Sequence, residues 1–360
     1  MLTKIIEGAL RHRWAVLIGW LAIAIAGVLS FRALPIDAFP DTTPTQVQVN
    51  TIAPALAPQE TERQLTMPIE QALAGLPKVE ELRSISKFGL SQITVRFVDG
   101  TDLWLARQLI AERVNRVDLP VGIEKPTLGP VATGLGEVFH YLVRGKGKTT
   151  EELRTLHDWV IAPQLRSVPG VAEVNSWGGY ERQWHVVVDP RRLQKFDLSL
   201  GDLYQALEEN NANVGGGILE QSGGASLILG VGALSDGKAI EGVVIAAHEG
   251  VPVRVRDVAR VEVGHEIRRA AVTADGQGET VLGLGFMLVG ENSHAVTAAL
   301  ATRLRDVQSS LPAGVDVTPV YERTELVDLV LATVRNSLLE GALLVIAVLF
   351  VFLGNLRAGL

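Results

Sequence analysis

Histidine and the acidic residues are the side chains with which this sequence could bind metal ions, because none of its 360 residues is cysteine. Its seven histidines are scattered, and no two have the H-x-H, H-x-x-x-H or H-E-x-x-H spacing that presents two ligands from one element. The absence of cysteine also removes disulfides and thiolate redox chemistry. We therefore expect no local metal or catalytic centre, and folding would have to assemble any metal site.

Two aspartates stand in a proline-rich stretch, LPIDAFPDTTP, at residues 34–44. Carboxylates at the mouth of a cleft gather cations, so Asp37 and Asp41 are the candidate metal-entrance residues of this sequence. The alternative is a stiff connector in which both carboxylates cap turns and stay in water. The sequence leaves both interpretations open.

Several glycine patterns resemble phosphate-binding loops but are incomplete. Gly147, Lys148 and Thr149 match the end of a Walker A loop, yet Leu142 occupies the place of its first glycine. The glycine pairs at 134/136 and 283/285 lack the third glycine of a dinucleotide fingerprint. A net charge of -7 argues against nucleic acid as a partner. We expect no cofactor, no nucleic-acid partner and no enzymatic activity.

The elements that must position these residues begin and end with apolar runs. Residues 14–31 and 338–353 each approach the roughly 20 apolar residues with which a helix crosses a bilayer. Three basic residues precede the first run and Arg357 follows the second, which places both flanks in the cytoplasm and the middle outside. A signal peptide is the alternative for the first run, although its apolar region is long for one. We predict two transmembrane helices.

Between the runs, a β-α-β-β-α-β order is predicted twice. The first copy comprises strand 46–52, helix 58–73, strands 79–87 and 91–98, helix 102–117 and a strand near 127–131. The second begins with strand 138–143, helix 150–168 and strands 172–177 and 183–188, and ends with strand 281–289, helix 294–311 and strand 315–320. This order is typical of ferredoxin-like, split βαβ units.

The displaced end of the second copy implies an insertion over residues 189–269. A helix is predicted there over 200–209, followed by a glycine-rich stretch at 210–232 that is typical of a long hairpin. Its apolar residues lie in a segment too short to form a core, so we expect a neighbouring subunit to cover them. The candidate contact residues are Val214, Gly215, Gly216, Gly217, Ile218 and Leu219.

Four long stretches resemble the heavy-metal efflux branch of the resistance-nodulation-division transporters. They are LPIDAFPDTTPTQVQVNTIAPALAPQETERQLTMPIE (34–70), FGLSQITVRFVDGTDLWLARQLIAERV (88–114), VPVRVRDVARVEVGHEIRRA (251–270) and LLEGALLVIAVLFVFLGNLRAGL (338–360). The resemblance implies a homotrimeric, proton-driven pump of the bacterial inner membrane with a large periplasmic domain. Such pumps pass divalent metal cations to a periplasmic adaptor, the membrane fusion protein, and an outer-membrane channel.

The fold that the resemblance implies is an α+β membrane protein. Two transmembrane helices flank two ferredoxin-like (split βαβ) porter subdomains, with a docking subdomain inserted in the second. The expected division is a cytoplasmic N-terminus (1–13), helix 1 (14–31), the first porter subdomain (32–130), the second (131–188 and 270–325), the docking subdomain (189–269), helix 2 (326–354) and a cytoplasmic turn (355–360). This would be the first third of a pump, ending before helix 3 and before the family's proton-relay and main metal-binding residues.

The choice of metal follows from ligand softness. Copper and silver pumps use methionine, but this chain has only three, and Ile267 stands where the resemblance leads us to expect methionine in a copper-type relative. Zinc, cobalt, cadmium or nickel is therefore favoured. Three alternatives remain: a multidrug exporter of the same superfamily, a membrane-anchored periplasmic sensor with two helices, and a polysaccharide co-polymerase.

Overall fold

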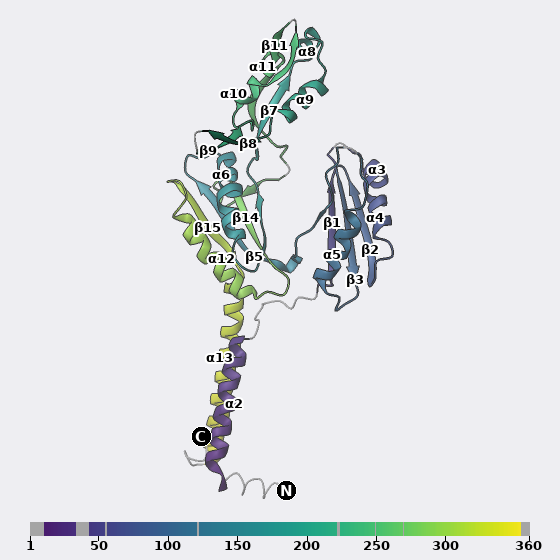
Figure 1. Cartoon of the computed structure of the whole chain (residues 1–360). Helices are drawn as coiled ribbons and strands as arrows, with labels where there is room; N and C mark the ends of the chain where they lie inside the picture. The colour runs from purple at the N-terminus through teal and green to yellow at the C-terminus, as the bar shows by residue number, and fades with distance from the viewer. Residues whose placement is uncertain are drawn as a thin grey trace.

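The computed structural model describes residues 11–33, 43–54, 56–120, 122–221, 224–248, 250–268 and 270–353. Two long helices form its lower part, two α/β units lie above them, and a smaller inserted unit stands at the top (Figure 1). Asp37 and Asp41, the candidate entrance residues, lie outside the described residues.

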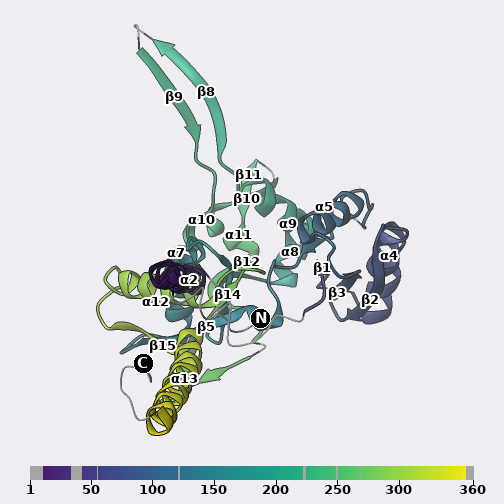
Figure 2. The same cartoon turned by 90° about the horizontal axis from the view of Figure 1, so that it is seen from below.

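Helices α2 (Arg13–Ala33) and α13 (Arg323–Leu353) carry the apolar runs. They overlap in Figure 1, but Figure 2 shows them apart. Among the described residues, Arg323–Phe352 is the one helix long and apolar enough to cross a bilayer, whereas the apolar part of α2, Trp14–Gly27, is shorter. No residue in the most apolar part of α13 is buried, so this helix needs lipid or further protein around it.

The first α/β unit is an antiparallel sheet of order β2-β3-β1-β4 with helices packed on it. Its strands are β1 (Gln46–Ile52), β2 (Val79–Lys87), β3 (Leu90–Phe97) and β4 (Thr127–Leu128). One continuous helix is formed by α3 (Pro58–Thr61), the π-helical turn η1 (Glu62–Thr66) and α4 (Met67–Leu73), and α5 spans Leu103–Val114. Asp102 starts α5 by accepting a hydrogen bond from Trp104 N at 2.7 Å.

The second α/β unit is assembled from two distant parts of the chain, as predicted. The first part supplies η2 (Gly134–Gly136), β5 (Glu137–Gly145), α6 (Thr150–Leu156), the π-helical turn η3 (His157–Ile161), α7 (Ala162–Arg166) and β6 (Val171–Trp177). The second supplies β13 (Val272–Thr273), β14 (Glu279–Met287), α12 (Ser293–Gln308) and β15 (Val315–Glu322). Strand β14 pairs with both β5 and β6, and β15 pairs with β5.

The inserted unit lies between these two parts and has a hydrophobic core of its own. It contains β7 (Arg182–Val188), α8 (Pro190–Lys195), α9 (Leu200–Glu209), α10 (Gly237–Gly242), β10 (Val244–His248), β11 (Val251–Arg254), α11 (Val255–Val258) and β12 (Ala259–His265). The strand predicted at 183–188 forms as β7, but its assignment to the second α/β unit was wrong. It pairs with β12, because Val186 and Val188 pack into the inserted core.

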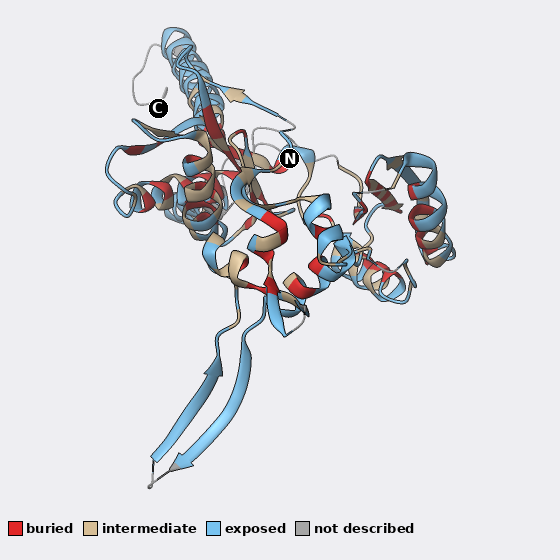
Figure 3. Cartoon of the chain, turned by 90° about the horizontal axis from the view of Figure 1, so that it is seen from above, coloured by how far each residue is buried: buried red, intermediate tan, exposed pale blue. Residues whose placement is uncertain are grey.

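The arm is the hairpin β8 (Val214–Gln221) and β9 (Gly224–Gly230), which leaves the inserted unit sideways (Figure 2). Ile218 opposes Leu227 across the hairpin, as the sequence pattern predicts for paired strands. Every residue of β9 is exposed, and the arm carries no buried colour in Figure 3. The predicted hairpin is therefore confirmed, while the subunit contact predicted for it stays a prediction.

Candidate functional site

Helices cover one face of the sheet in the second α/β unit, whereas the other, here called the open face, carries partly exposed polar side chains around buried Leu142 and Leu284. Phe139, Tyr141 and Val143 of β5 point into the core beneath the helices. Because side chains alternate along a strand, His140 points to the open face, where its ring lies 4.9 Å from the ring of Tyr321. The side chains of His140 and Glu137 are 26% and 37% exposed, although His140 Nε2 itself is buried.

Acidic side chains flank an aromatic residue on the open face. The strand register places Phe286 of β14 opposite Glu137 on one side and Glu173 on the other, so the two glutamates stand roughly 10 Å apart. Glu137 Oε1 lies 2.6 Å from His140 Nε2, and Asn175 Nδ2 donates to Glu173 Oε2 at 3.2 Å.

The donor set of this open face is carboxylate, imidazole and amide. Zinc, cobalt, nickel and cadmium accept such ligands, whereas Cu(I) prefers sulfur. Among the described residues, however, no three histidine or acidic side chains stand close enough to hold a metal ion together. By itself the open face can attract and contact a cation, but it cannot enclose one.

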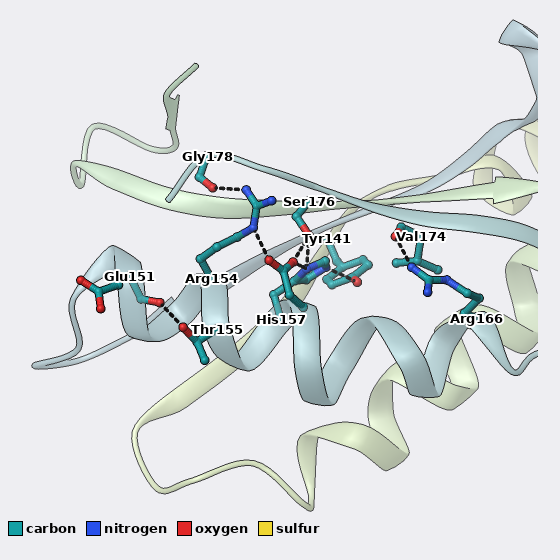
Figure 4. A network of polar contacts seen from close by, with 10 residues as sticks. Tyr141, Glu151, Arg154, Thr155, His157, Arg166, Val174, Ser176 and Gly178 are labelled. Atoms are coloured by element: carbon teal, nitrogen blue, oxygen red, sulfur yellow. Dashed lines mark hydrogen bonds and ion pairs between the residues drawn. The ribbon is translucent and has the colours of Figure 1, made fainter. Parts of the chain in front are cut away.

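A buried polar network lies on the opposite, helix-covered side of the same sheet (Figure 4). The ring of His157, which has no exposed surface, lies with Nε2 2.7 Å from the Tyr141 hydroxyl and Nδ1 2.6 Å from Ser176 Oγ. Asp158 Oδ1 accepts from Ser176 and lies 3.1 Å from His157 Nδ1. Serine, histidine and aspartate thus meet, but the buried tyrosine occupies the second ring nitrogen, so no substrate can reach it.

Electrostatics keep Asp158 charged and Tyr141 neutral. Burial raises the pKa of Asp158, but hydrogen bonds from His157, Ser176 and Arg154 outweigh burial and bring that pKa to about 2. Arg154 Nε lies 2.6 Å from Asp158 Oδ2. Burial and the charge of Asp158 raise the pKa of Tyr141 well above its ordinary value. The network therefore has a structural role: it joins the helix that carries His157 and Asp158 to strands β5 and β6.

Asp158→Asn should lower the stability of the second α/β unit at neutral pH by about 2 kcal/mol. The folded-state pKa of about 2 lies below the unfolded value, so the stabilisation is present above about pH 4 and is lost as pH falls toward 2. Urea unfolding followed by circular dichroism at a series of pH values measures this. In Asp158→Asn the acid-dependent loss should disappear, whereas Asp99→Asn, an exposed carboxylate of the first α/β unit, should retain it.

The sequence did not single out the open face or the network. Their residues are far apart in the chain, and the neighbouring His157 and Asp158 gave the only local signal of the network. Glu137 at the start of β5 and Glu173 between apolar residues of β6 are the only local signals of the open face. Of the predicted site residues, Val214 and Ile218 are exposed on the arm, at 65% and 67%.

The profile of the AcrB/AcrD/AcrF family matches residues 5–360. Protein HelA of Legionella pneumophila is 52% identical over 369 residues, covering 100% of this chain and 35% of the relative. The cobalt-zinc-cadmium resistance protein CzcA of Cupriavidus metallidurans is 45% identical over 371 residues, with the same coverage. The cation efflux system protein CusA of Escherichia coli strain K12 is 36% identical over 365 residues, again covering 100% and 35%.

A solved structure has the same arrangement. The crystal structure of a heavy metal efflux pump, crystal form II, superimposes with a TM-score of 0.89 at 35% sequence identity, covering 99% of this chain and 36% of that one. The chain therefore spans about a third of the length of the relatives that it matches.

Proposed function

The chain belongs to the AcrB/AcrD/AcrF family, and we propose that it forms the N-terminal third of a heavy-metal cation efflux pump. The observation that carries this proposal is the superposition of nearly the whole chain on a heavy metal efflux pump. The relatives named above for metal resistance or cation efflux support it and do not favour a multidrug exporter, a sensor or a polysaccharide co-polymerase.

In this proposal α13 and α2 anchor the chain in the bacterial inner membrane. The two α/β units act as periplasmic porter subdomains, and the inserted unit acts as the docking subdomain. The exposed apolar surface of α13 supports membrane insertion. A pump of this kind is a secondary transporter, driven by proton antiport through residues beyond this chain, and works with an adaptor and an outer-membrane channel.

The proposed substrates are Zn, Co, Cd or Ni ions, in preference to Cu or Ag. The open face offers Glu137, Glu173 and His140, which suit the first group of metals. Neither described methionine adds a thioether ligand for Cu or Ag to the open face. Met287 is 8% exposed and packs in the core, and Met67, which is 44% exposed, lies in the first α/β unit. The open face would be one wall of the cation route, which the rest of the pump completes.

A chimera tests this function. The first third of the CzcA protein of Cupriavidus metallidurans is replaced by this chain, and the chimera is expressed in a metal-sensitive host. Because the two segments are 45% identical over the full chain, the chimera should assemble and restore growth in zinc, cobalt or cadmium. The proposal would be contradicted by a chimera that reaches the membrane but restores growth in none of these metals.

The open face is tested in the same chimera. Glu137→Gln with Glu173→Gln keeps side-chain size but removes both charges, so metal tolerance should fall about tenfold, equivalent to about 1.4 kcal/mol of lost cation attraction. The matched control is Glu262→Gln, an exposed glutamate of the inserted unit that pairs with Arg260. If the double variant tolerates metal as well as the control does, the open face is not part of the cation route, whereas the proposed efflux function is unaffected.

A further inference from the structure

The inserted unit is joined to the second α/β unit by a narrow neck, defined as residues 178–182 and 265–268. The two segments run as a ribbon: Glu266 N donates to Glu181 O at 3.0 Å, and the β7–β12 ladder continues upward from Arg182 and His265. The hydrophobic cores on either side of the neck are separate clusters. The orientation of the inserted unit therefore depends on what holds the neck.

Two adjacent glycines bend the chain where β6 enters the neck. Gly178 and Gly179 have φ angles of 76° and 69°, in the left-handed region that favours glycine. A Cβ at Gly178 would lie 2.7 Å from the Thr280 carbonyl oxygen, and one at Gly179 would lie 2.8 Å from that of Thr150. Only glycine suits these two positions, because each needs a left-handed backbone conformation and leaves no room for a Cβ.

Gly178 and Gly179 pack closely against the second α/β unit, but open space lies beside the rest of the neck. A cavity of about 280 Å³ is lined by Ser176, Tyr180 and Ile267 among others, and a cleft of about 460 Å³ separates Trp159 from Trp184. Hinges between rigid bodies are typically a few residues in loops or at the ends of elements that absorb large changes in φ and ψ. Beyond the glycine bend, polar contacts restrain the neck.

Arg268 makes the first restraint by joining both segments of the neck to the sheet. Its guanidinium carbon lies 5.3 Å from the ring centroid of Tyr180, and Nη1 donates to the Tyr180 hydroxyl at 2.9 Å. Nη2 forms an ion pair with Glu279 Oε1 of β14 at 2.6 Å. The ring of His265 covers Tyr180 at a centroid distance of 4.4 Å. The guanidinium of Arg268, in the second segment of the neck, thus links Tyr180 of the first segment to Glu279 of the sheet.

Arg154 makes the second restraint from the helix side. Its Nη1 donates to the carbonyl oxygen of Gly178 at 3.0 Å, while Nε is held by Asp158 of the buried network. Because the side chain of Arg154 is only 20% exposed, solvent screens this contact weakly. The glycine bend is therefore connected to the buried His157.

We propose that the neck is a hinge with its pivot at Gly178 and Gly179, and that Arg268 and Arg154 are positioning residues that hold the inserted unit in one orientation. Loss of either contact releases the pivot without unfolding the unit on either side, since both cores lie outside the neck. This inference concerns the neck alone and is independent of the transported substrate.

Spin-label distances across the neck test the hinge in the whole chain, which has no native cysteine to interfere. Labels are attached to Gln194→Cys on α8 and Ala299→Cys on α12, both exposed positions. The unmodified neck should give one narrow distance distribution. Arg268→Ala and Arg154→Ala should each broaden it at least about twofold, because the released ribbon samples several orientations.

Two further variants distinguish positioning from general destabilisation. Arg268→Lys retains the charge opposite Glu279 but loses the planar fork, so it should give an intermediate width. Arg260→Ala removes an exposed arginine of β12 that pairs only locally with Glu262, and it should leave the width unchanged. Circular dichroism should show the same helix and strand content throughout. An unchanged width in both neck variants, or equal broadening in Arg260→Ala, would overturn the hinge.

Discussion

Gly283→Ala should destabilise the second α/β unit by about 3 kcal/mol, at the upper end of the usual cost of overpacking. A Cβ at this position would lie 2.1 Å from Cζ of Tyr141 and 2.5 Å from its hydroxyl oxygen. The ring cannot move aside cheaply, because Tyr141 is fully buried and hydrogen-bonded to His157. Hydrogen exchange of peptides from β5 and β14 measures the loss, since 3 kcal/mol corresponds to about a hundredfold faster exchange.

Gly285→Ala on the same strand is the matched control. Its Cβ would meet Leu300 Cδ1 at 3.2 Å, the end of a flexible side chain, so we expect a change of at most about 1 kcal/mol. Tyr141→Leu should partly relieve Gly283→Ala, so that the double variant is less destabilised than the sum of the single variants. Simple additivity would show that the cost at Gly283 has another origin.

The order of helices and strands could be predicted because local patterns determine it. Strand β3 alternates buried and partly buried residues, and Thr149 starts α6 as an N-cap whose side chain accepts from Glu152 N at 3.2 Å. The split of the second α/β unit was also predictable, since its missing helix and strand return a hundred residues later. Here periodicity and capping agree with the tertiary structure.

The partner of β7 and the residues of the site could not be predicted in this way. Alternation along 183–188 indicates a strand, but it does not say whether the strand pairs with β14 or with β12. The pairing depends on which hydrophobic core receives Val186 and Val188. The open face and the neck likewise depend on strand register and on contacts such as that of Arg154 with Gly178, which a linear pattern does not contain.

Disrupting the apolar surface of the arm should weaken the proposed trimer. Leu227, Leu229 and Ile218 are 77%, 61% and 67% exposed, a continuous apolar surface that a soluble monomer would rarely display. In the proposed pump the membrane anchors keep all copies upright, so the rotation axis of a ring lies along the membrane normal. An arm that extends sideways, as in Figure 2, then meets a neighbour at its own height and closes the ring by a heterologous contact.

Deleting residues 214–226 in the full-length pump, or replacing Ile218, Leu227 and Leu229 there by serine, should weaken the trimer and lower the mass measured by light scattering in detergent. Burying three such side chains contributes several kcal/mol, roughly 2 kcal/mol each, which is enough to decide assembly at micromolar concentration. Ile52→Ser is the matched control, because Ile52 is 55% exposed but lies on β1 of the first α/β unit, away from the arm and the neck. An unchanged trimer after the arm substitutions, with both α/β units folded, would indicate that the arm contacts a different protein.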